Sequence, residues 1–358
     1  MRKNTEADRP FNVLFGICTP YRQFEPTYIA CRVARWAAYR YLPFTIYTEK
    51  PPRPRVDAAF DKALLDPTKL RFSTWLEKSS AVFWSGFPPY EQVSYVSNSL
   101  KKRTFLYVDP RNIDEDDKYT LSLVDAALVP SQRMHKLLTR RWKLQNVIYC
   151  PYSADIVPQS RVGLRSRLVR IAVPIIDEFA SETELAFIYQ LNGILKQCAN
   201  VTIRLIISPS KISSGAKRRI KALAKLSQGR FEVCKAASFD NRASQLLDVD
   251  LVVWPALRNN AGCYLNLCAS LGVPFVCFGF PPNDEFASDL GGYTVNVPYN
   301  TEDKVRWTAI PDYTVFVDKI VELVQNPREL RLRSKFIQTK LANRAGMFNK
   351  TMDSLFEI

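Results

Sequence analysis

A small polar loop at residues 258–262 lies between an apolar run and a stretch with helical spacing. Small side chains let a backbone approach a ligand closely, and the N-terminus of the following helix directs backbone N–H groups toward a phosphate. An arginine at the start of the loop adds a charge-assisted contact to the same phosphate. The alternative is an ordinary loop with an asparagine helix cap. We expect a phosphate to be bound by Arg258, Asn259, Asn260, Ala261 and Gly262.

Two carboxylates follow expected strands and could act as a general base. Asp109 comes directly after the apolar run 104–108, and Glu25 lies in the loop expected after the first strand, residues 11–18. At the carboxyl edge of a sheet, either side chain could take the proton from an attacking hydroxyl group. The competing interpretation for each is a loop carboxylate in a salt bridge.

Three other side chains lie at expected strand ends in the first part of the chain: Arg22, Trp84 and Arg111. An aromatic ring beside arginines suits a stacked base that has been turned out of a duplex. We therefore expect these residues to meet a second substrate, while Trp84 is equally compatible with a place in the core.

Several other chemistries lack the residues that they need. His135 is the single histidine, and none of the eight cysteines forms a C-x-x-C pair, so a zinc site has neither the histidines nor the spacing that it needs. Asp248 and Asp250 form a D-x-D pattern, which binds a metal ion in some other proteins. Because they directly precede the apolar run 251–254, we expect a structural role. Neither an essential metal nor a tightly bound cofactor is expected.

The composition is that of a soluble globular protein. The chain has 358 residues, which at roughly 150 residues per domain suggests two domains. Apolar residues make up 47% and charged residues 24%, which excludes disorder and a collagen-like repeat. The charged N-terminus is not a signal peptide, and the cysteines read as buried, reduced thiols. We expect a cytoplasmic location, in a host cell if the protein is encoded by a bacteriophage.

Strand-like and helix-like segments alternate over most of the chain, which is typical of parallel sheets covered by helices. A break at 151–167, with prolines and a basic cluster, separates two similar units. We predict an α/β fold of two doubly wound parallel-sheet (Rossmann-like) domains that face a cleft. They occupy 1–157 and 158–335, and a helix at 336–358 crosses back to the first domain. Strands are expected at 11–18, 44–48, 81–84, 104–108, 126–129, 169–173, 202–207, 230–233, 251–254 and 274–278.

The run from 248 to 276 combines a strand, a Pro-Ala step, the polar loop, a helix and a Leu-Gly-Val-Pro turn into the next strand. This order resembles the donor site of GT-B glycosyltransferases, above all the retaining glycosyltransferase family 4. In that family a strand ending in Pro-Ser leads into Glu-Gly-Phe-Gly. The stretches 121–131 and 148–155 are similar to the family's last N-domain strand and to its Pro-Asn-Gly-Val-Asp turn. The likeness covers about residues 120–335.

The resemblance implies a nucleotide-sugar-dependent glycosyltransferase of the hexosyltransferase class. The loop residues 258–262 then form the donor site together with Cys263, Ser208 and Lys235, and a UDP-sugar is the expected donor. The first domain would bind the acceptor through Arg22, Trp84 and Arg111, and Asp109 or Glu25 would be the catalytic base.

The sequence departs from the family at three places. Asn259 and Leu267 stand where the family has two glutamates, the second of which holds the donor ribose. Residues 173–182 lack the arginine and lysine that grip the pyrophosphate, and residues 19–25 replace a glycine pair. A standard family-4 site is therefore absent. A catalytically degenerate GT-B protein that binds nucleic acid is one alternative function.

The net charge of +15 comes from 50 Lys and Arg against 35 Asp and Glu. Two stretches concentrate it, since 211–235 has Glu232 as its one acid and 132–170 has Asp155. Such fields attract nucleic acid or an anionic membrane. We expect a monomer with a DNA acceptor, a 5-hydroxymethylated pyrimidine, as in the basic transferases with which bacteriophages modify DNA. The alternative acceptor is a lipid-linked or lipopolysaccharide sugar at the cytoplasmic membrane face.

Overall fold

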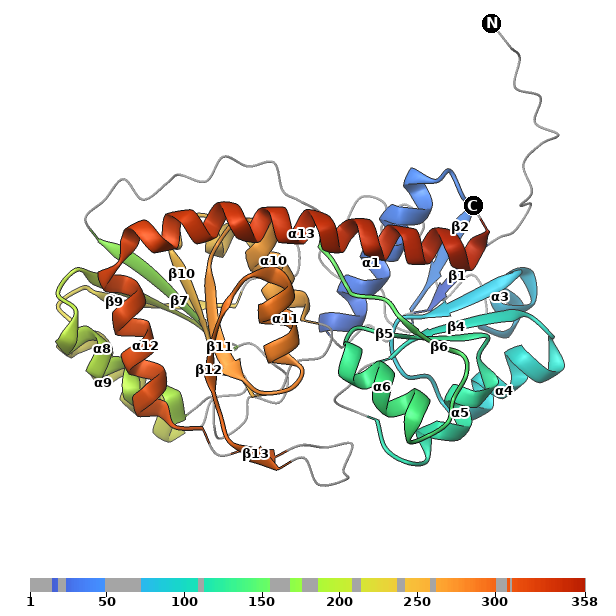
Figure 1. The fold of residues 1–358 in the computed structure, drawn as a ribbon, viewed down its shortest axis with the longest axis horizontal. Helices are drawn as coiled ribbons and strands as arrows, with labels where there is room; N and C mark the ends of the chain where they lie inside the picture. Colours follow the sequence, from blue (N-terminus) through green and yellow to red (C-terminus); the bar gives the residue numbers. More distant parts are fainter. Residues whose placement is uncertain are drawn as a thin grey trace, which may run out of the picture. The chain divides into compact units, whose positions relative to one another are not determined.

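The computed structural model describes residues 15–18, 24–48, 72–108, 113–154, 168–175, 186–207, 214–236, 242–257, 262–300, 308–309 and 311–357. The chain forms two compact units. The first unit comprises Met1–Val129 and Met134–Tyr149, and the second comprises Pro130–Arg133 and Cys150–Ile358. Each unit contains one six-stranded sheet (Figure 1).

The first sheet is parallel throughout, with the strand order β2-β1-β3-β4-β5-β6. The order of the strands reverses between β1 and β3. The chain runs from β1 to its neighbour β2 on one side, and then adds β3 to β6 on the other side of β1. The strands are β1 (Phe15–Cys18), β2 (Phe44–Tyr47), β3 (Ala81–Trp84), β4 (Arg103–Tyr107), β5 (Ala126–Val129) and β6 (Val147–Tyr149). The helices are α1 (Phe24–Tyr39), α3 (Phe72–Lys78), α4 (Tyr90–Ser94) with a π-helical continuation (Tyr95–Ser99), α5 (Asp117–Leu123) and α6 (Gln132–Arg140).

The second sheet is also parallel, with the order β12-β11-β10-β7-β8-β9. Here the order reverses between β7 and β10. The strands are β7 (Val169–Ile175), β8 (Val201–Ile207), β9 (Phe231–Lys235), β10 (Leu251–Trp254), β11 (Phe275–Gly279) and β12 (Tyr293–Asn296), and β13 (Tyr299–Asn300) pairs with β14 (Thr308–Ala309) in a separate antiparallel ribbon. The helical segments are η3 (Ile188–Gln190), α8 (Leu191–Gln197), α9 (Ser214–Leu226), η6 (Ala243–Leu246), α10 (Cys263–Ser270), α11 (Asn283–Leu290), α12 (Tyr313–Gln325) and α13 (Pro327–Phe356).

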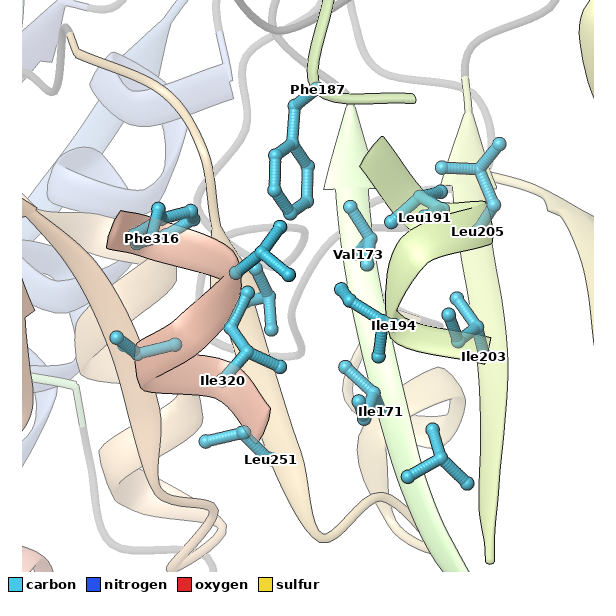
Figure 2. Close-up of a cluster of buried hydrophobic side chains, with 14 of the residues drawn as sticks. Ile171, Val173, Phe187, Leu191, Ile194, Ile203, Leu205, Leu251, Phe316 and Ile320 are labelled. Atoms are coloured by element: carbon cyan, nitrogen blue, oxygen red, sulfur yellow. The ribbon is translucent and has the colours of Figure 1, made fainter. Parts of the chain in front are cut away.

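The core of the second unit forms where helices cover the apolar strands. Figure 2 shows Ile194 of α8 meeting Ile171 of β7 and Ile203 of β8, with Phe316 and Ile320 of α12 in the same cluster. Strands β10 and β11 are buried along their whole length, as expected for central strands that carry helices on both faces.

The last two helices have clear start signals. The Asp312 carboxylate accepts hydrogen bonds from the backbone N–H groups of Thr314 and Val315, and Asn326 caps α13, whose first residue is Pro327. The 30-residue helix α13 (red in Figure 1) packs against α10, α11 and α12. Its buried stripe has helical spacing and contains Leu330, Ile337, Leu341, Arg344, Phe348, Met352 and Phe356.

Arg344 is the one arginine in that stripe, and its side chain is 3% exposed. Its guanidinium donates hydrogen bonds to the backbone carbonyl of Tyr152, at 2.8 Å, and to that of Pro130, at 3.5 Å. It also forms an ion pair with Asp289 of α11. One buried cation therefore joins α13 to two chain segments that are far away in the sequence.

Residues 130–133 belong to the second unit although the chain on both sides belongs to the first. The Glu285 carboxylate of α11 accepts hydrogen bonds from the backbone N–H groups of Gln132, at 2.7 Å, and Arg133, at 3.0 Å. The Arg133 guanidinium lies 2.7 Å from the Asp284 carboxylate. The Glu285 carboxylate thus satisfies two backbone donors of this short segment within the second unit.

The predicted fold class is confirmed, because both units are doubly wound parallel sheets. The strands expected from the sequence did not include β6, β12, β13 and β14. Glu25 lies in the first turn of α1 rather than in a loop, because this helix begins at Phe24. The expected linker residues 155–167 lie outside the described residues. The domain boundaries at 157 and 335 and the return of the last helix to the first domain stay predictions.

Candidate functional site

The point at which strand order reverses is the usual ligand site of a doubly wound sheet, beyond the carboxyl ends of the strands. In the second unit this point lies between β7 and β10. Strand β10 ends at Trp254, and helix α10 begins at Cys263 after the loop that the sequence singled out. Gly262, the described residue that precedes α10 and one of those predicted to bind the donor, therefore lies on the connection that leaves β10 at this reversal point.

Gly262 cannot be replaced by another residue without strain. Its φ is +71°, in the left-handed region, where a side chain is disfavoured. An added Cβ would also lie 2.8 Å from Cδ2 of Phe286 on α11. The ring of Phe286 thus closes the space beside the start of α10, and glycine is required for both conformation and packing.

Two asparagines that the sequence analysis did not select bracket this loop. The Asn266 side chain donates from Nδ2 to the carbonyl of Gly262 at 2.9 Å. The Asn283 side chain, at the start of α11, donates from Nδ2 to the carbonyl of Ala256 at 2.8 Å. Both residues are fully buried, and the Oδ1 atom of each has no hydrogen-bond partner. An asparagine inside the otherwise apolar helix α10 was the signal that could have identified Asn266.

Trp254 lies at the same edge of the sheet. Its ring stacks on Tyr264 of α10, with centroids 5.0 Å apart and 24° between the planes. Its indole Nε1 is buried and has no partner. The carboxyl end of β10 therefore carries one unpaired donor, and the two asparagines carry two unpaired acceptors.

Most of the residues selected from the sequence lie outside the described residues: Arg22, Asp109, Arg111, Ser208, Arg258, Asn259, Asn260 and Ala261. Of Glu25 the structure describes the backbone alone. Cys263 is the first residue of α10, and its side chain is fully buried, so any contact with a ligand would come from its backbone.

Lys235 is not brought to the start of α10. It is the last residue of β9, and strands β7 and β8 lie between β9 and β10. Three strand spacings correspond to about 14 Å. Both residues are at the carboxyl edge of the sheet, but Lys235 stands at its far side, where its carbonyl accepts a hydrogen bond from Gln245.

The first unit repeats the arrangement at its own reversal point, between β1 and β3. Trp84 ends β3 opposite Cys18 of β1, and Ser85 donates from its backbone N–H to the Cys18 carbonyl at 3.0 Å. The Trp84 side chain is 2% exposed, and its ring meets Phe72 edge-on. Its ring face is covered, so the expected stacking of an acceptor base on Trp84 is not available in this structure. Its Nε1 atom is buried without a partner.

The D-x-D pattern has the structural role predicted for it. The Asp250 carboxylate accepts a hydrogen bond from the Arg170 backbone N–H at 2.9 Å. The Asp248 carboxylate is bound by Arg204, at 2.6 Å, and forms an ion pair with Arg170. Burial alone would raise the pKa of Asp248, but hydrogen bonds and charge from Arg204, with the charge of Arg170, lower it. Within the described residues, no group of three or more His, Cys, Asp and Glu could hold a metal ion.

We expect Asp248→Asn to reduce the sensitivity of the protein to acid. Because the folded pKa of Asp248 lies below its ordinary value of 3.8, the carboxylate adds stability above that pH. This contribution is lost as the pH falls below about 4 through the folded pKa. Urea midpoints measured from neutral to acid pH should fall less steeply for the variant than for the wild type. Asp318→Asn, on the exposed face of α12, is the control, and equal slopes for all three proteins would contradict the expectation.

Part of the predicted basic surface lies on α9. Its outward residues are exposed and include no acid: Lys217, Arg218, Arg219, Lys221 and Lys225. The Arg219 guanidinium lies 4.0 Å from the centroid of the Tyr189 ring. Ile220 and Leu223 face the core. The helix therefore presents a cationic surface whose apolar side is already covered.

No family model matches the sequence, and no curated protein sequence matches it. Solved structures do match its fold over nearly the whole length. A glycosyltransferase from Rickettsia africae has a TM-score of 0.71 at 10% identity, covering 97% of this chain and 98% of its own. The fold is that of the GT-B glycosyltransferases.

Two other GT-B structures are similar to the chain. The lipopolysaccharide outer core galactosyltransferase WaaB, in its apo form, has a TM-score of 0.61 at 12% identity, covering 95% of this chain and 99% of its own. Anabaena HepE, in complex with UDP and glucose, has a TM-score of 0.64 at 10% identity, covering 96% and 99%. At these identities the likeness concerns the fold. In the part of the chain that is described, no helix is both long and apolar enough to cross a bilayer.

Proposed function

We propose that the protein is a glycosyltransferase that moves a sugar from a nucleotide sugar to a hydroxyl group. The observation that carries the proposal is the geometry of Gly262, a left-handed glycine at the start of α10 and at the reversal point of the second sheet. A left-handed glycine, which has no side chain of its own, followed by a helix N-terminus, suits a diphosphate. The GT-B fold of the neighbours supports the same reaction.

The proposed donor is a UDP-sugar, because HepE, which shares the fold, binds UDP and glucose. The second unit would bind it through Gly262 and through Arg258, Asn259 and Asn260, with Ala261, Cys263 and Ser208 around them. In the family, an arginine and a lysine that this chain lacks bind the pyrophosphate. Arg258 would supply the positive charge in their place. We propose no tightly bound cofactor and no essential metal.

In the proposed reaction, a carboxylate takes the proton of the acceptor hydroxyl as its oxygen bonds to the anomeric carbon. The bond from that carbon to the diphosphate oxygen breaks, and UDP leaves with the electron pair. Asp109 and Glu25 are the candidate bases for this inverting sequence. Acceptor contacts are proposed for Arg22, Trp84 and Arg111, the second through its indole N–H rather than its ring face.

The proposed acceptor is a sugar of lipopolysaccharide or of a lipid carrier. WaaB acts in the lipopolysaccharide outer core by its name, and the cationic face of α9 suits an anionic membrane surface. A DNA acceptor is supported only by the net charge of +15. None of the three structures described above has a name that mentions DNA. A monomer at the cytoplasmic face of the membrane completes the proposal.

The test measures binding and transfer separately. Calorimetry with UDP, GDP and ADP should detect UDP binding, and absence of binding for all three nucleotides would contradict the proposed function. Transfer from radiolabelled UDP-sugars should label a lipid extract and leave a hydroxymethylated DNA duplex unlabelled. Label in the duplex would restore the DNA acceptor, and UDP binding without transfer to either would favour a degenerate binding protein.

A further inference from the structure

Three buried polar atoms without partners lie around one strand–loop–helix connection of the second unit. They are Nε1 of Trp254, Oδ1 of Asn266 and Oδ1 of Asn283. The side chains are 6%, 0% and 0% exposed, so water does not reach these atoms freely. Folded proteins rarely leave buried polar atoms unpaired, since each loses its hydrogen bonds to water. Such a group at a ligand site indicates where a ligand completes the bonding.

The orientation of both amides is set by their own hydrogen bonds. Nδ2 of Asn266 donates to the Gly262 carbonyl and Nδ2 of Asn283 to the Ala256 carbonyl, at 2.9 and 2.8 Å. A flipped amide would set its oxygen against a carbonyl oxygen in either case. Each Oδ1 is therefore an acceptor that the protein itself does not use. Because Ala256 and Gly262 stand before and after the loop 257–261, the two amides bracket that loop.

These acceptors select the chemistry of their partner. A diphosphate offers acceptor oxygens at neutral pH, so it cannot satisfy Asn266 or Asn283, whereas a hydroxyl group can donate to them and also accept from an N–H. Both amides are neutral, so their bonding does not depend on pH as a carboxylate's would.

We infer that Asn266 and Asn283 accept hydrogen bonds from hydroxyl groups of the bound nucleotide sugar, with the Trp254 indole donating to one of these groups. The inference rests on the proposed function, since the ligand is the proposed donor. Sugar hydroxyls occur both on the ribose and on the transferred hexose. The two sources share the chemistry and are separated by the ligands chosen for the test.

The first experiment changes the ligand and leaves the protein intact, so that folding is not at risk. Calorimetry of the full chain compares UDP, 2′-deoxy-UDP, 3′-deoxy-UDP and UDP-glucose. If the ribose is the partner, loss of one hydroxyl should weaken binding about tenfold, the size expected for one buried hydrogen bond. If the hexose is the partner, UDP-glucose should bind about tenfold more tightly than UDP, and the deoxy forms should bind as UDP does.

The second experiment removes the acceptors through Asn266→Leu and Asn283→Leu. Each variant should lose the tenfold difference for the hydroxyl group that its asparagine binds, because that hydroxyl no longer has a partner. Asn98→Leu, at an exposed asparagine of the first unit, should keep that difference. Urea unfolding of each variant shows whether the fold is retained.

The outcomes separate the two proposals. UDP binding with equal affinities for all four ligands in the wild type overturns the inference and leaves the proposed function intact. Ligand differences that persist in folded Asn266→Leu and Asn283→Leu proteins overturn it as well, since other groups or water would then make the contacts. Absence of binding for every nucleotide overturns the proposed function itself.

Discussion

Gly262→Ala is expected to lower both the stability of the protein and its affinity for nucleotide. The methyl group would meet the Phe286 ring at 2.8 Å, and the backbone φ of +71° would be strained. Overpacking and a left-handed alanine together should reduce the free energy of unfolding by about 3 kcal/mol. Because relief of this strain displaces the start of α10, UDP affinity should fall at least about tenfold, a loss of about 1.4 kcal/mol.

Two comparisons separate the causes of this effect. Gly346→Ala, in the middle of α13 with no atom within 4 Å of the new Cβ, should stabilise the protein by about 0.5–1 kcal/mol. Adding Phe286→Leu to Gly262→Ala should recover the part of the unfolding free energy that is lost through the clash with the ring. The part that is lost through the strained φ should remain. Urea unfolding and calorimetry measure these changes. Unaltered stability and affinity in Gly262→Ala would show that the start of α10 adapts and that our donor site is misplaced.

Arg344→Met is expected to destabilise the second unit by about 3 kcal/mol, because buried carbonyls would lose their donor. The guanidinium is the partner of the Tyr152 and Pro130 carbonyls. Asp289 is partly exposed and can return to water, so the loss should come mainly from the carbonyls.

Arg331→Met provides the matched control, since this arginine is an exposed residue of the same helix. Its effect should stay within about 0.5 kcal/mol. Arg344→Lys should recover little, because one ammonium cannot reach three separated acceptors as a planar guanidinium does. Urea unfolding midpoints measure these changes in stability. Equal midpoints for Arg344→Met and Arg331→Met would contradict a stabilising role of the buried Arg344 side chain.

The fold could be predicted because its central strands are uniform apolar runs. Strands β3, β5 and β10 (Ala-Val-Phe-Trp, Ala-Ala-Leu-Val and Leu-Val-Val-Trp) were predicted with the bounds observed. Strands β6 and β12 were missed, and each is an edge strand with partly exposed residues. An edge strand needs fewer apolar side chains than a central one, so its pattern is weaker.

The candidate site could be predicted in part. Its position depends on the order of elements, which the sequence displays, and Gly262 was selected as a small residue. The need for glycine arises from the ring of Phe286, which lies 24 residues further along the chain. The Asn283 amide donates to the carbonyl of Ala256, 27 residues earlier, so no local pattern could reveal its unpaired oxygen. The Asn266 amide donates to Gly262, four residues earlier, and an asparagine within α10 was the one local signal for it.

The placement of residues 130–133 in the second unit also constrains the order of events during synthesis. Residue 149, the last of the first unit, is made before most of the second unit, and N-terminal domains generally fold first during synthesis. The Glu285 carboxylate that binds the N–H groups of Gln132 and Arg133, however, lies 153 and 152 residues further along the chain. Arg344, which donates to the Pro130 carbonyl, lies 214 residues beyond it. A nascent chain therefore completes these contacts in two steps, at Gln132 and Arg133 once α11 has been made and at Pro130 once residue 344 of α13 has been made.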